Sequence, residues 1–340
     1  MTGILIKSFN RPYYLDRCIA SIFKNVLGDF RISILDDGTP EKYLTKIQEK
    51  YPNITIIKSD QYLQKVKAIE ENLHSGKDIN GFEIPTQLWK KAVEKSSDYV
   101  LVTEDDVWFF DKINLNKLVA DMRLHHINMV KLGWLGNLKD ERHQKTEPLN
   151  SLLNKTIPKK LFTSNEMIMD LFMYNKFKFF TILYKLNFFE NAYKRRYWAL
   201  NSILMGLYQK EYWLHIWKDA NGKVDEKQQL RNAAVWYHRN KKNENFVAKT
   251  NKEYMKTTFQ SSATNSYHQY DFDFDVNYFN HKMNEAWYHN NFDALQNYPN
   301  DFSLDYFEQF FDEKINKAEF RKWVEKFKNQ YKNLGCNVDS

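Results

Sequence analysis

Three carboxylate side chains, Glu104, Asp105 and Asp106, follow one another directly after an apolar run at 99–102. A short run rich in Val is typical of a buried strand. Adjacent carboxylates repel one another, so a fold keeps them together where something positive faces them, and a divalent cation with oxygen ligands meets that need. The pattern therefore indicates a cation site at the end of a strand, with a solvated acidic turn as the alternative.

A second acidic pair, Asp36 and Asp37, follows the apolar run 32–35 in the same way and leads into Gly38. Open parallel sheets bind their ligands at the carboxyl ends of the strands. Two acidic clusters at two strand ends therefore strengthen the prediction of a ligand site at one edge of a sheet. The alternative for this pair is a turn, because Asp-Gly is favourable turn chemistry, and one of the two aspartates is then structural.

Short apolar runs predict the strands that would carry these acids. The predicted strands lie at 3–6, 32–35, 54–57, 99–102 and 129–132. Helices are predicted over 12–27, 41–50 and 85–95. Residues 60–83 have no clear pattern. The alternation of strands and helices in the first part of the chain predicts a parallel sheet with right-handed crossovers.

The end of the chain predicts a further helix. Asn316 with Glu319 forms a capping-box-like start, and Gly335 ends the helix. Apolar residues recur between these ends at helical spacing and form one stripe. We expect this helix to pack on the body of the protein as a structural appendage, with an interaction module as the alternative.

Composition bounds the class of protein. The chain has 340 residues, of which 43% are hydrophobic, so a folded protein of about two units is expected. The formal charge of +7 does not by itself indicate nucleic-acid binding, and it suits an anionic substrate or a membrane surface. Two cysteines, Cys18 and Cys336, and the lack of a signal peptide predict a reducing, cytoplasmic location. No apolar run reaches the ~20 residues that span a bilayer.

These motifs, in this order and spacing, resemble those of the GT-A fold glycosyltransferases, particularly the family-2-like ones. The matching segments are Ser8-Phe9-Asn10-Arg11 after the first strand, Asp36-Asp37-Gly38-Thr39 after the second, and Glu104-Asp105-Asp106 in place of the Asp-x-Asp signature. The resemblance covers roughly residues 4–135. It implies an α/β, Rossmann-like fold whose mainly parallel central sheet is flanked by helices, here with a helical C-terminal extension. The family's Arg-Asn pair before the metal strand is missing, and Lys90 or Lys91 is the nearest substitute.

The resemblance also implies roles for these residues. Asp106 would be the direct ligand of Mg²⁺ or Mn²⁺, which stabilises the charge that develops on the leaving nucleoside diphosphate. Glu104 and Asp105 would hold ribose, sugar hydroxyls or metal-bound water. Asp36 or Asp37 would accept hydrogen bonds from the base or ribose. The remaining donor-site residues implied by the motifs are Ser8, Phe9 and Arg11, the last as a partner of the base or of phosphate.

Inverting transfer, which is the expectation here, also needs a carboxylate base for the acceptor hydroxyl. The family often supplies this base as Glu-Asp before a helix in the second half, with an Arg a few residues on. The nearest match is the reversed pair Asp225-Glu226, followed by Arg231. Asp170 and Glu190 are further candidates. For each, an ordinary surface acid is the alternative, and a retaining enzyme would need no such base.

The second half is less specific. Region 171–217 is dense in aromatic and basic residues, which predicts an acceptor-side core, with a membrane-resting surface or nucleic-acid stacking as alternatives. Residues 137–165 are predicted to connect the halves. The polar stretch 251–266 is a lid over the diphosphate or a plain loop. Candidates for completing a metal site are His215, His238 and His268, against packed or exposed histidines.

The sequence thus predicts an enzyme with three parts. They are a nucleotide-sugar (donor) half over 1–136, an acceptor-side half of the same catalytic domain over 137–240, and a lid-like loop with the helical extension over 241–340. The predicted activity is metal-dependent transfer of a sugar from a UDP- or GDP-linked donor to a hydroxyl of a glycan or glycolipid. The predicted place is the cytoplasm or the cytoplasmic face of a membrane, with peripheral contact through 171–217.

Two alternatives remain open. One is a non-catalytic protein of the same fold that binds membrane or nucleic acid. The other is a different nucleotide-sugar enzyme, a hydrolase or a nucleotidyltransferase. A nucleotidyltransferase normally needs a glycine-rich phosphate loop near the N-terminus, and Ser8–Pro12 contains no glycine.

Overall fold

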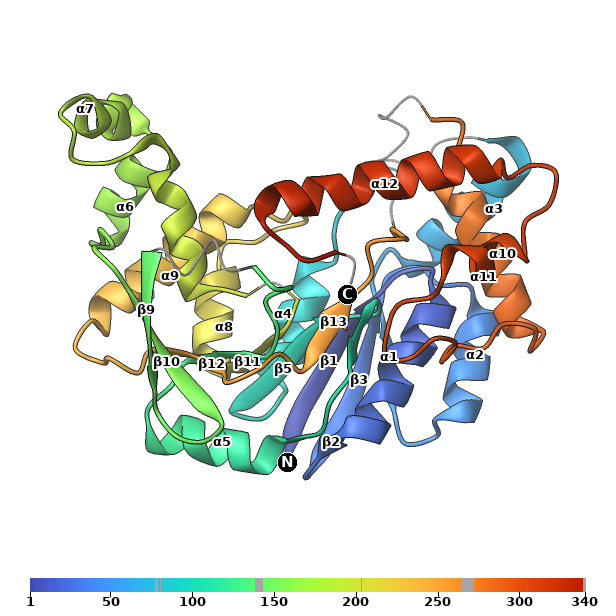
Figure 1. Cartoon of the computed structure of the whole chain (residues 1–340), viewed down its shortest axis with the longest axis horizontal. Helices are drawn as coiled ribbons and strands as arrows, with labels where there is room; N and C mark the ends of the chain where they lie inside the picture. Colours follow the sequence, from blue (N-terminus) through green and yellow to red (C-terminus); the bar gives the residue numbers. More distant parts are fainter. Residues whose placement is uncertain (77–78, 80, 138–142, 203, 264–271, 339–340) are drawn as a thin grey trace.

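The computed structural model describes residues 1–76, 79, 81–137, 143–202, 204–263 and 272–338. Helices flank a mixed sheet (Figure 1). The first part of the chain forms β1 (Thr2–Ser8), α1 (Pro12–Asn25), β2 (Val26–Leu27), β3 (Phe30–Asp36), α2 (Glu41–Lys50), β4 (Thr55–Lys58), α3 (Tyr62–Ser75), α4 (Thr86–Glu94), β5 (Tyr99–Glu104), β6 (Val107–Phe109), β7 (Ile113–Asn114), α5 (Leu115–Leu124) and β8 (Met129–Lys131). The remainder forms β9 (Gln144–Pro148), β10 (Leu153–Pro158), α6 (Glu166–Met173), the 3₁₀ helix η2 (Lys176–Lys178), α7 (Phe179–Lys185), the 3₁₀ helix η3 (Asn191–Leu200), β11 (Gly206–Gln209), α8 (Lys210–Trp217), α9 (Glu226–Arg239), β12 (Val247–Thr250), β13 (Met255–Thr257), α10 (Val276–Tyr288), α11 (Leu304–Glu308) and α12 (Lys317–Leu334).

The order of strands in the sheet is β4-β3-β1-β5-β11-β8-β12-β10-β9. β1 pairs in parallel with β3 and β5, and β3 pairs in parallel with β4, so these strands end at one edge. The register places Ser8 opposite Asp36 and Lys7 opposite Glu104. The two acidic clusters predicted from the sequence therefore meet at the same edge, on either side of the end of β1.

The central strands are buried on both faces, which is why their sequences are continuously apolar. On one face, Ile4 and Ile6 of β1 pack with the buried side chains of α1, α2 and α5. On the other, Leu5 packs with Val100 and Val102 of β5 and with α4, α8 and α9. This double layer of helices holds the strand ends rigidly in place.

The predicted α/β class is confirmed. The strands β4, β3, β1 and β5 are parallel as expected, whereas β11 runs antiparallel to both β5 and β8 and makes the whole sheet mixed. Residues 137–165, predicted as a connection, contain the hairpin of β9 and β10, which extends the sheet at its edge. Edge strands there need few apolar side chains, so the sequence lacks a strand pattern.

The unassigned stretch 60–83 contains α3. Its buried face includes two polar residues, Lys65 and Asn72, beside Tyr62 and Ile69. Polar side chains on the inward face obscure the spacing that predicts a helix. Lys65 points its amine toward the edge of the sheet where β3 ends.

The helical C-terminal extension is also confirmed. The side chain of Asn316 accepts hydrogen bonds from the N–H groups of Ala318 and Glu319, and α12 ends at Gly335, whose φ is 99°. Phe320 stacks on Phe279 of α10 with ring centroids 5.2 Å apart, so the helix packs on the body. Throughout the described ranges, no helix is both long and apolar enough to cross a membrane.

Candidate active site

The acidic run at the end of β5 is neutralised by two cations from the end of β1 and the turn after it. Lys7 Nζ lies 2.6 Å from Glu104 Oε1. Arg11 contacts Asp105 Oδ1 at 2.5 Å and Asp106 Oδ2 at 3.0 Å. The side chain of Asp105 is only 3% exposed, which excludes the solvated acidic turn for this residue. The positive partner that three adjacent acids require is therefore built into the chain.

Burial dominates the electrostatics of this cluster. It raises the pKa of Asp105 to about 7, with Arg11 opposing the shift and Asp106 adding to it. Burial likewise raises the pKa of Asp106, against the attraction of Arg11. Burial alone would lower the pKa of the Arg11 guanidinium, but the two carboxylates reverse this and raise it. Buried ionisable groups with shifted pKa values at a cleft are typical of functional sites.

The neighbouring pair Asp36 and Asp37 divides into two roles. Asp36 is fully buried and accepts hydrogen bonds from the N–H groups of Gly38 and Thr39, at 3.0 and 2.8 Å, and from the Thr39 hydroxyl at 2.7 Å. Burial raises its pKa to about 6, against these hydrogen bonds. Asp37 lies instead at a pocket and binds Lys65 Nζ at 2.5 Å. The turn interpretation thus holds for Asp36, whereas Asp37 lines the pocket.

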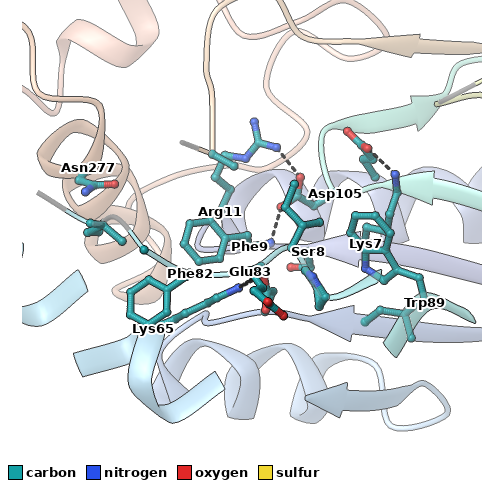
Figure 2. A pocket seen from close by; sticks show the side chains of 18 residues that line it. Lys7, Ser8, Phe9, Arg11, Lys65, Phe82, Glu83, Trp89, Asp105 and Asn277 are labelled. Carbon is teal, nitrogen blue, oxygen red and sulfur yellow. Dashed lines mark hydrogen bonds and ion pairs between the residues drawn. The ribbon is translucent and has the colours of Figure 1, made fainter. Parts of the chain in front are cut away.

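A pocket of about 360 Å³ opens between these groups (Figure 2). Cationic, acidic and aromatic side chains line it together. The lining residues labelled in Figure 2 are Lys7, Ser8, Phe9, Arg11, Lys65, Phe82, Glu83, Trp89, Asp105 and Asn277. Asp37 and Glu104 line it as well. Of the predicted donor-site residues, the structure brings all but Asp36 and Asp106 to this one pocket, and those two lie directly beside residues that line it.

Asp106 is the residue to test for a metal. Its Oδ2 faces Arg11, whereas its buried Oδ1 has no hydrogen-bond partner among the residues that the structure describes. In the part of the chain that the structure describes, no three His, Cys, Asp or Glu side chains form a group that could hold an ion alone. Mg²⁺ usually binds through one or two carboxylates together with substrate phosphates. One unpartnered carboxylate oxygen beside the pocket fits such a shared site.

The segment after β13 forms a wall of the site. The Thr257 hydroxyl donates to the Asp106 carbonyl at 3.0 Å, and Thr258 N–H donates to the same carbonyl at 3.3 Å. Ser261 is buried, and its hydroxyl lies 3.1 Å from that of Tyr13. The stretch predicted as a lid or loop is thus packed against the acidic cluster as far as Ala263, which lines the pocket. Its end, 264–266, lies outside the described residues.

The candidate bases lie elsewhere. Asp225 is exposed and caps α9, accepting a hydrogen bond from Gln228 N–H at 3.0 Å, and Glu226 follows it at the exposed start of the helix. Asp170 on α6 contacts Arg231 Nε at 3.2 Å. None of these three lines the pocket. Glu190 binds Arg196 at 2.6 Å on the surface.

The histidines predicted as metal candidates are likewise away from the pocket. His215 of α8 packs on Trp236 with ring centroids 4.8 Å apart. His238 of α9 lies with its Nδ1 3.4 Å from the Thr163 hydroxyl. Neither is a lining residue. His268 lies outside the described residues.

Several pocket residues were missed by the sequence analysis. Lys7 is the charged residue near the end of an otherwise apolar strand, a signal that could have identified it. Lys65 lies on the unassigned helix α3, and Phe82 in the loop that follows it. Trp89 of α4 lies under Lys7, whose Nζ is 4.7 Å from its ring centroid. Lys90, predicted as a substitute for the missing Arg-Asn pair, instead donates to the Ala220 carbonyl at 2.9 Å.

A second cavity, of about 490 Å³, lies farther along the same edge of the sheet. β11 is antiparallel to both β5 and β8, so β8 is parallel to β5 and ends at the same edge. The cavity is lined by Lys131 and Gly133 at the end of β8, by Arg195 and Trp198 of η3, and by the end of α12. This second cavity lies beside the acidic cluster, on the side formed by residues after 130.

Residues 3–73 match the family model described as Glycosyl transferase family 2. Among the curated proteins, no match is found. TarS of S. aureus, residues 1–349, is 13% identical with a TM-score of 0.42, and the alignment covers 97% of this chain and 73% of that one. The same protein in complex with UDP-GlcNAc is 12% identical, with coverage of 98% and 72% and a TM-score of 0.43.

Glucosyl-3-phosphoglycerate synthase of Mycobacterium tuberculosis is similar at 10% identity, over 87% of this chain and 82% of that one, with a TM-score of 0.40. The family match spans the part of the chain from β1 into α3. It includes the turn after β1, the acidic pair after β3 and Lys65. The predicted resemblance to the family-2-like glycosyltransferases is thus confirmed, and so is the predicted enzyme class, a glycosyltransferase.

Proposed function

We propose that this enzyme transfers a sugar from a UDP- or GDP-linked donor to a hydroxyl of a glycan or glycolipid acceptor, with a divalent cation and with inversion. The observation that carries the proposal is the pocket at the ends of β1, β3 and β5. There Asp37, three cationic side chains and aromatic rings surround one cavity beside the unpartnered oxygen of Asp106. Its volume, about 360 Å³, lies in the range of small-molecule sites.

Each part of the pocket suits one part of a nucleotide-sugar. Phe9 and Phe82 offer ring faces for a base, and Asp37 offers a carboxylate for base N–H or ribose hydroxyl groups. Asp37 already binds Lys65, so its carboxylate is held in a fixed place. Lys7 and Arg11 lie toward the acidic cluster, where a diphosphate would bring its negative charge.

The chemistry follows from the charge that the leaving diphosphate gains when the glycosidic bond breaks. A bound divalent ion would supply Lewis-acid stabilisation of that charge, and Asp106 is the residue that would hold it. Arg11 keeps Asp105 and Asp106 together at fixed positions despite their repulsion. Glu104 and Asp105 line the pocket and offer oxygens to ribose or sugar hydroxyls.

Asp225 and Glu226 are our preferred candidates for the base, ahead of Asp170. Asp170 is engaged by Arg231, whereas the pair at the start of α9 is exposed. The same loop approaches the pocket, because the Gly222 carbonyl accepts a hydrogen bond from Ile84 N–H, at 2.9 Å, and Ile84 lines the pocket. Glu226→Gln should abolish transfer while nucleotide affinity stays unchanged, and Asp225→Asn, which keeps the helix cap, separates the two acids.

The acceptor is proposed to enter from the side of the second cavity. Lys131, Arg195 and Trp198 there present positive charge and an aromatic ring, which suit a sugar that carries an anionic group. A reducing, cytoplasmic location is part of the proposal. Cys18 and Cys336 are not joined in a disulfide, which supports it.

The test is calorimetric titration of UDP and GDP into the protein, with and without Mn²⁺. We expect one nucleotide to bind tightly only with the metal, and Asp106→Asn to weaken that binding by about 100-fold. The matched control is Asp170→Asn, because this aspartate also pairs with an arginine but lies outside the pocket. Binding that needs no metal and survives Asp106→Asn would remove the metal role. Binding of neither nucleotide would overturn the proposal.

Donor turnover then separates reaction classes. Release of nucleoside diphosphate that depends on an added acceptor supports transfer. Equal release without any acceptor would indicate a hydrolase instead.

A further inference from the structure

The segment 174–189 forms a lobe whose exposed surface is unusual for this protein. In Figure 1, α7 stands clear of the sheet at the far end of the molecule from α10 and α11. Large apolar side chains protrude from it: Phe177 is 89% exposed, Phe188 68% and Leu186 61%, and Ile182 and Tyr184 are exposed too. Several large exposed apolar side chains in one short segment are a sign of contact with another phase or molecule. We name these five residues the apolar tip.

The charged side chains within residues 171–189 are all basic. Residues 171–189 contain no Asp or Glu, whereas Lys176, Lys178 and Lys185 are exposed among the apolar side chains. Only Lys176 has an ion pair among the described residues of this stretch, a partly exposed contact of 3.2 Å with Asp170. A surface with exposed apolar and basic side chains is complementary to a bilayer with acidic headgroups. The headgroups would attract the lysines, and the acyl region below them would accept the apolar side chains.

The tip is held on a packed base, so its exposure is built into the fold. Phe172, on the inner side of the lobe, contacts Phe180 and Phe189 with ring centroids 5.2 and 5.1 Å apart. The side chain of Asn175 closes the turn, accepting from Thr181 N–H at 3.1 Å. Three aromatic side chains, Phe177, Tyr184 and Phe188, are thus exposed above a base formed by Phe172, Phe180 and Phe189.

The backbone adds a second sign of function. Phe177 and Lys178 have φ angles of 51° and 57°, in the left-handed region that bulky side chains disfavour. The ring of Phe177 is almost fully exposed, so packing against the described residues does little to offset this strain. Strained residues of this kind persist where they serve a function.

We propose that the apolar tip and its three lysines dock this protein onto an anionic lipid surface. The rings and Leu186 would enter the headgroup region, and the lysine amines would pair with lipid phosphates. The lobe follows β10 and precedes β11, so it belongs to the second half of the chain. Docking through the lobe would place the second half of the chain next to lipid. This holds whether or not the donor pocket acts as proposed.

The experiment is co-sedimentation of the full chain with vesicles of phosphatidylcholine, with and without about 30% phosphatidylglycerol. We expect binding to the anionic vesicles alone. The triple variant Phe177→Ser, Leu186→Ser, Phe188→Ser should bind at least about tenfold more weakly. The matched control is Leu63→Ser with Leu124→Ser, two leucines that are each 71% exposed elsewhere, and it should bind like the wild type.

The charge is tested separately. Reversal of Lys176, Lys178 and Lys185 to Glu should weaken binding by about fivefold or more for each lysine. Insertion is read from a fluorophore that reports polarity, attached to Phe177→Cys in a Cys336→Ser background, with Leu63→Cys as the control position. Emission should shift to the blue with anionic vesicles at Phe177→Cys only.

Three outcomes would overturn the proposal. The first is no binding to either kind of vesicle. The second is a dimer in light scattering that the triple variant converts to a monomer, because the tip would then be an interface between copies of the chain. The third is binding to single-stranded nucleic acid in preference to vesicles. Nucleotide binding by the same variants should be unchanged, so failure here is distinguishable from failure of the proposed function.

Discussion

This molecule contains two clusters in each of which carboxylates surround an arginine. The two clusters differ in their access to water. The inner cluster is Arg11 with Asp105 and Asp106 at the end of β5. The outer cluster, on α6, α9 and the loop after α8, is Arg231 with Glu166, Asp170 and Asp219. The distances are similar, between 2.5 and 3.2 Å. In the inner cluster every side chain is buried or nearly so, whereas the carboxylates of the outer cluster reach solvent.

Because of this difference in burial, carboxylates at similar distances from an arginine have different net pKa shifts. Burial raises the pKa of Asp105 to about 7 even though Arg11 is in contact with it. In the outer cluster the hydrogen bond from Lys218 lowers the pKa of Glu166, with Arg231 acting in the same direction. Glu166 is thus stabilised as a carboxylate by its neighbours. The inner acids are held in a place that disfavours their charge, which is expected where a ligand's own charge completes the site.

The largest effect should come from removing the inner cation. Arg11→Met leaves two buried carboxylates without their cationic partner, and we expect a loss of about 3–5 kcal/mol in the free energy of unfolding. Arg231→Met should lose about 1 kcal/mol, because its carboxylates turn to water. Urea unfolding of both variants, at neutral pH and without nucleotide, measures the difference.

A second substitution provides the control for that comparison. Adding Asp105→Asn to Arg11→Met should restore part of the lost stability, since one of the unpaired charges is gone. If the two arginine variants lost equal stability, or the added Asn made matters worse, burial of charge would not be what separates the clusters.

The next largest effect concerns the two aspartates after β3. Asp36→Ala should lower the free energy of unfolding by about 1–3 kcal/mol, because the N–H groups of Gly38 and Thr39 lose their buried acceptor. Asp37→Asn keeps an acceptor for Lys65 and should change stability little, while it weakens nucleotide binding. Urea unfolding and nucleotide titration of both variants check this. The reverse pattern would show that the turn and the ligand face were assigned to the wrong residues.

The inner edge was largely predictable because its signals are local. The runs before Asp36 and Glu104 have strand character, and the order of strands and helices predicts parallel pairing, which brings the ends together. The sequence left open which aspartate of the pair was structural. That depends on the backbone of the turn, where Asp36 bonds to Gly38 and Thr39.

The cations and the second half were harder to predict. Pairing between Lys7 and Glu104 follows from strand register, which the sequence does not state. Lys65 lies on the inward face of α3, where a buried lysine interrupts the apolar spacing. The aromatic richness of 171–217 was visible, but a sequence does not say which rings face inward. Phe172 and Phe177 have the same type and opposite exposure.

A smaller effect should appear at His215, which is next to the outer cluster, as a dependence of stability on pH. Burial lowers the pKa of His215 to about 4, helped by Lys218 and Arg239 and opposed by Glu166 and Asp219. An unfolded histidine has a pKa of about 6.5. Between these values the unfolded chain binds a proton that the folded chain does not, so stability falls as the pH drops from about 6.5 to about 4.

His215→Gln removes that titration. We expect the wild type to lose more stability than the variant between about pH 7.5 and pH 5, measured by urea unfolding at both values. The carboxylates common to both proteins cancel in this difference. If the variant lost as much stability as the wild type, His215 would take up its proton in the folded protein as it does in the unfolded chain. Burial would then not disfavour the charged form of this histidine.

The smallest effect is expected at a third arginine, Arg321, which is the most exposed of the three. Arg321 of α12 donates to Glu308 and Asp305 at 2.6 Å each, as short as the contacts of Arg11, but it is half exposed. If distance decided the value of an ion pair, Arg321→Met would destabilise the protein as Arg11→Met does. Because exposed pairs exchange protein contacts for water at little net gain, we expect the urea midpoint to stay within error of the wild type. Any residual shift should vanish at about 1 M NaCl, where charges are screened within a few ångströms. A shift as large as that of Arg231→Met, unchanged by salt, would show that contact geometry rather than burial ranks the three arginines.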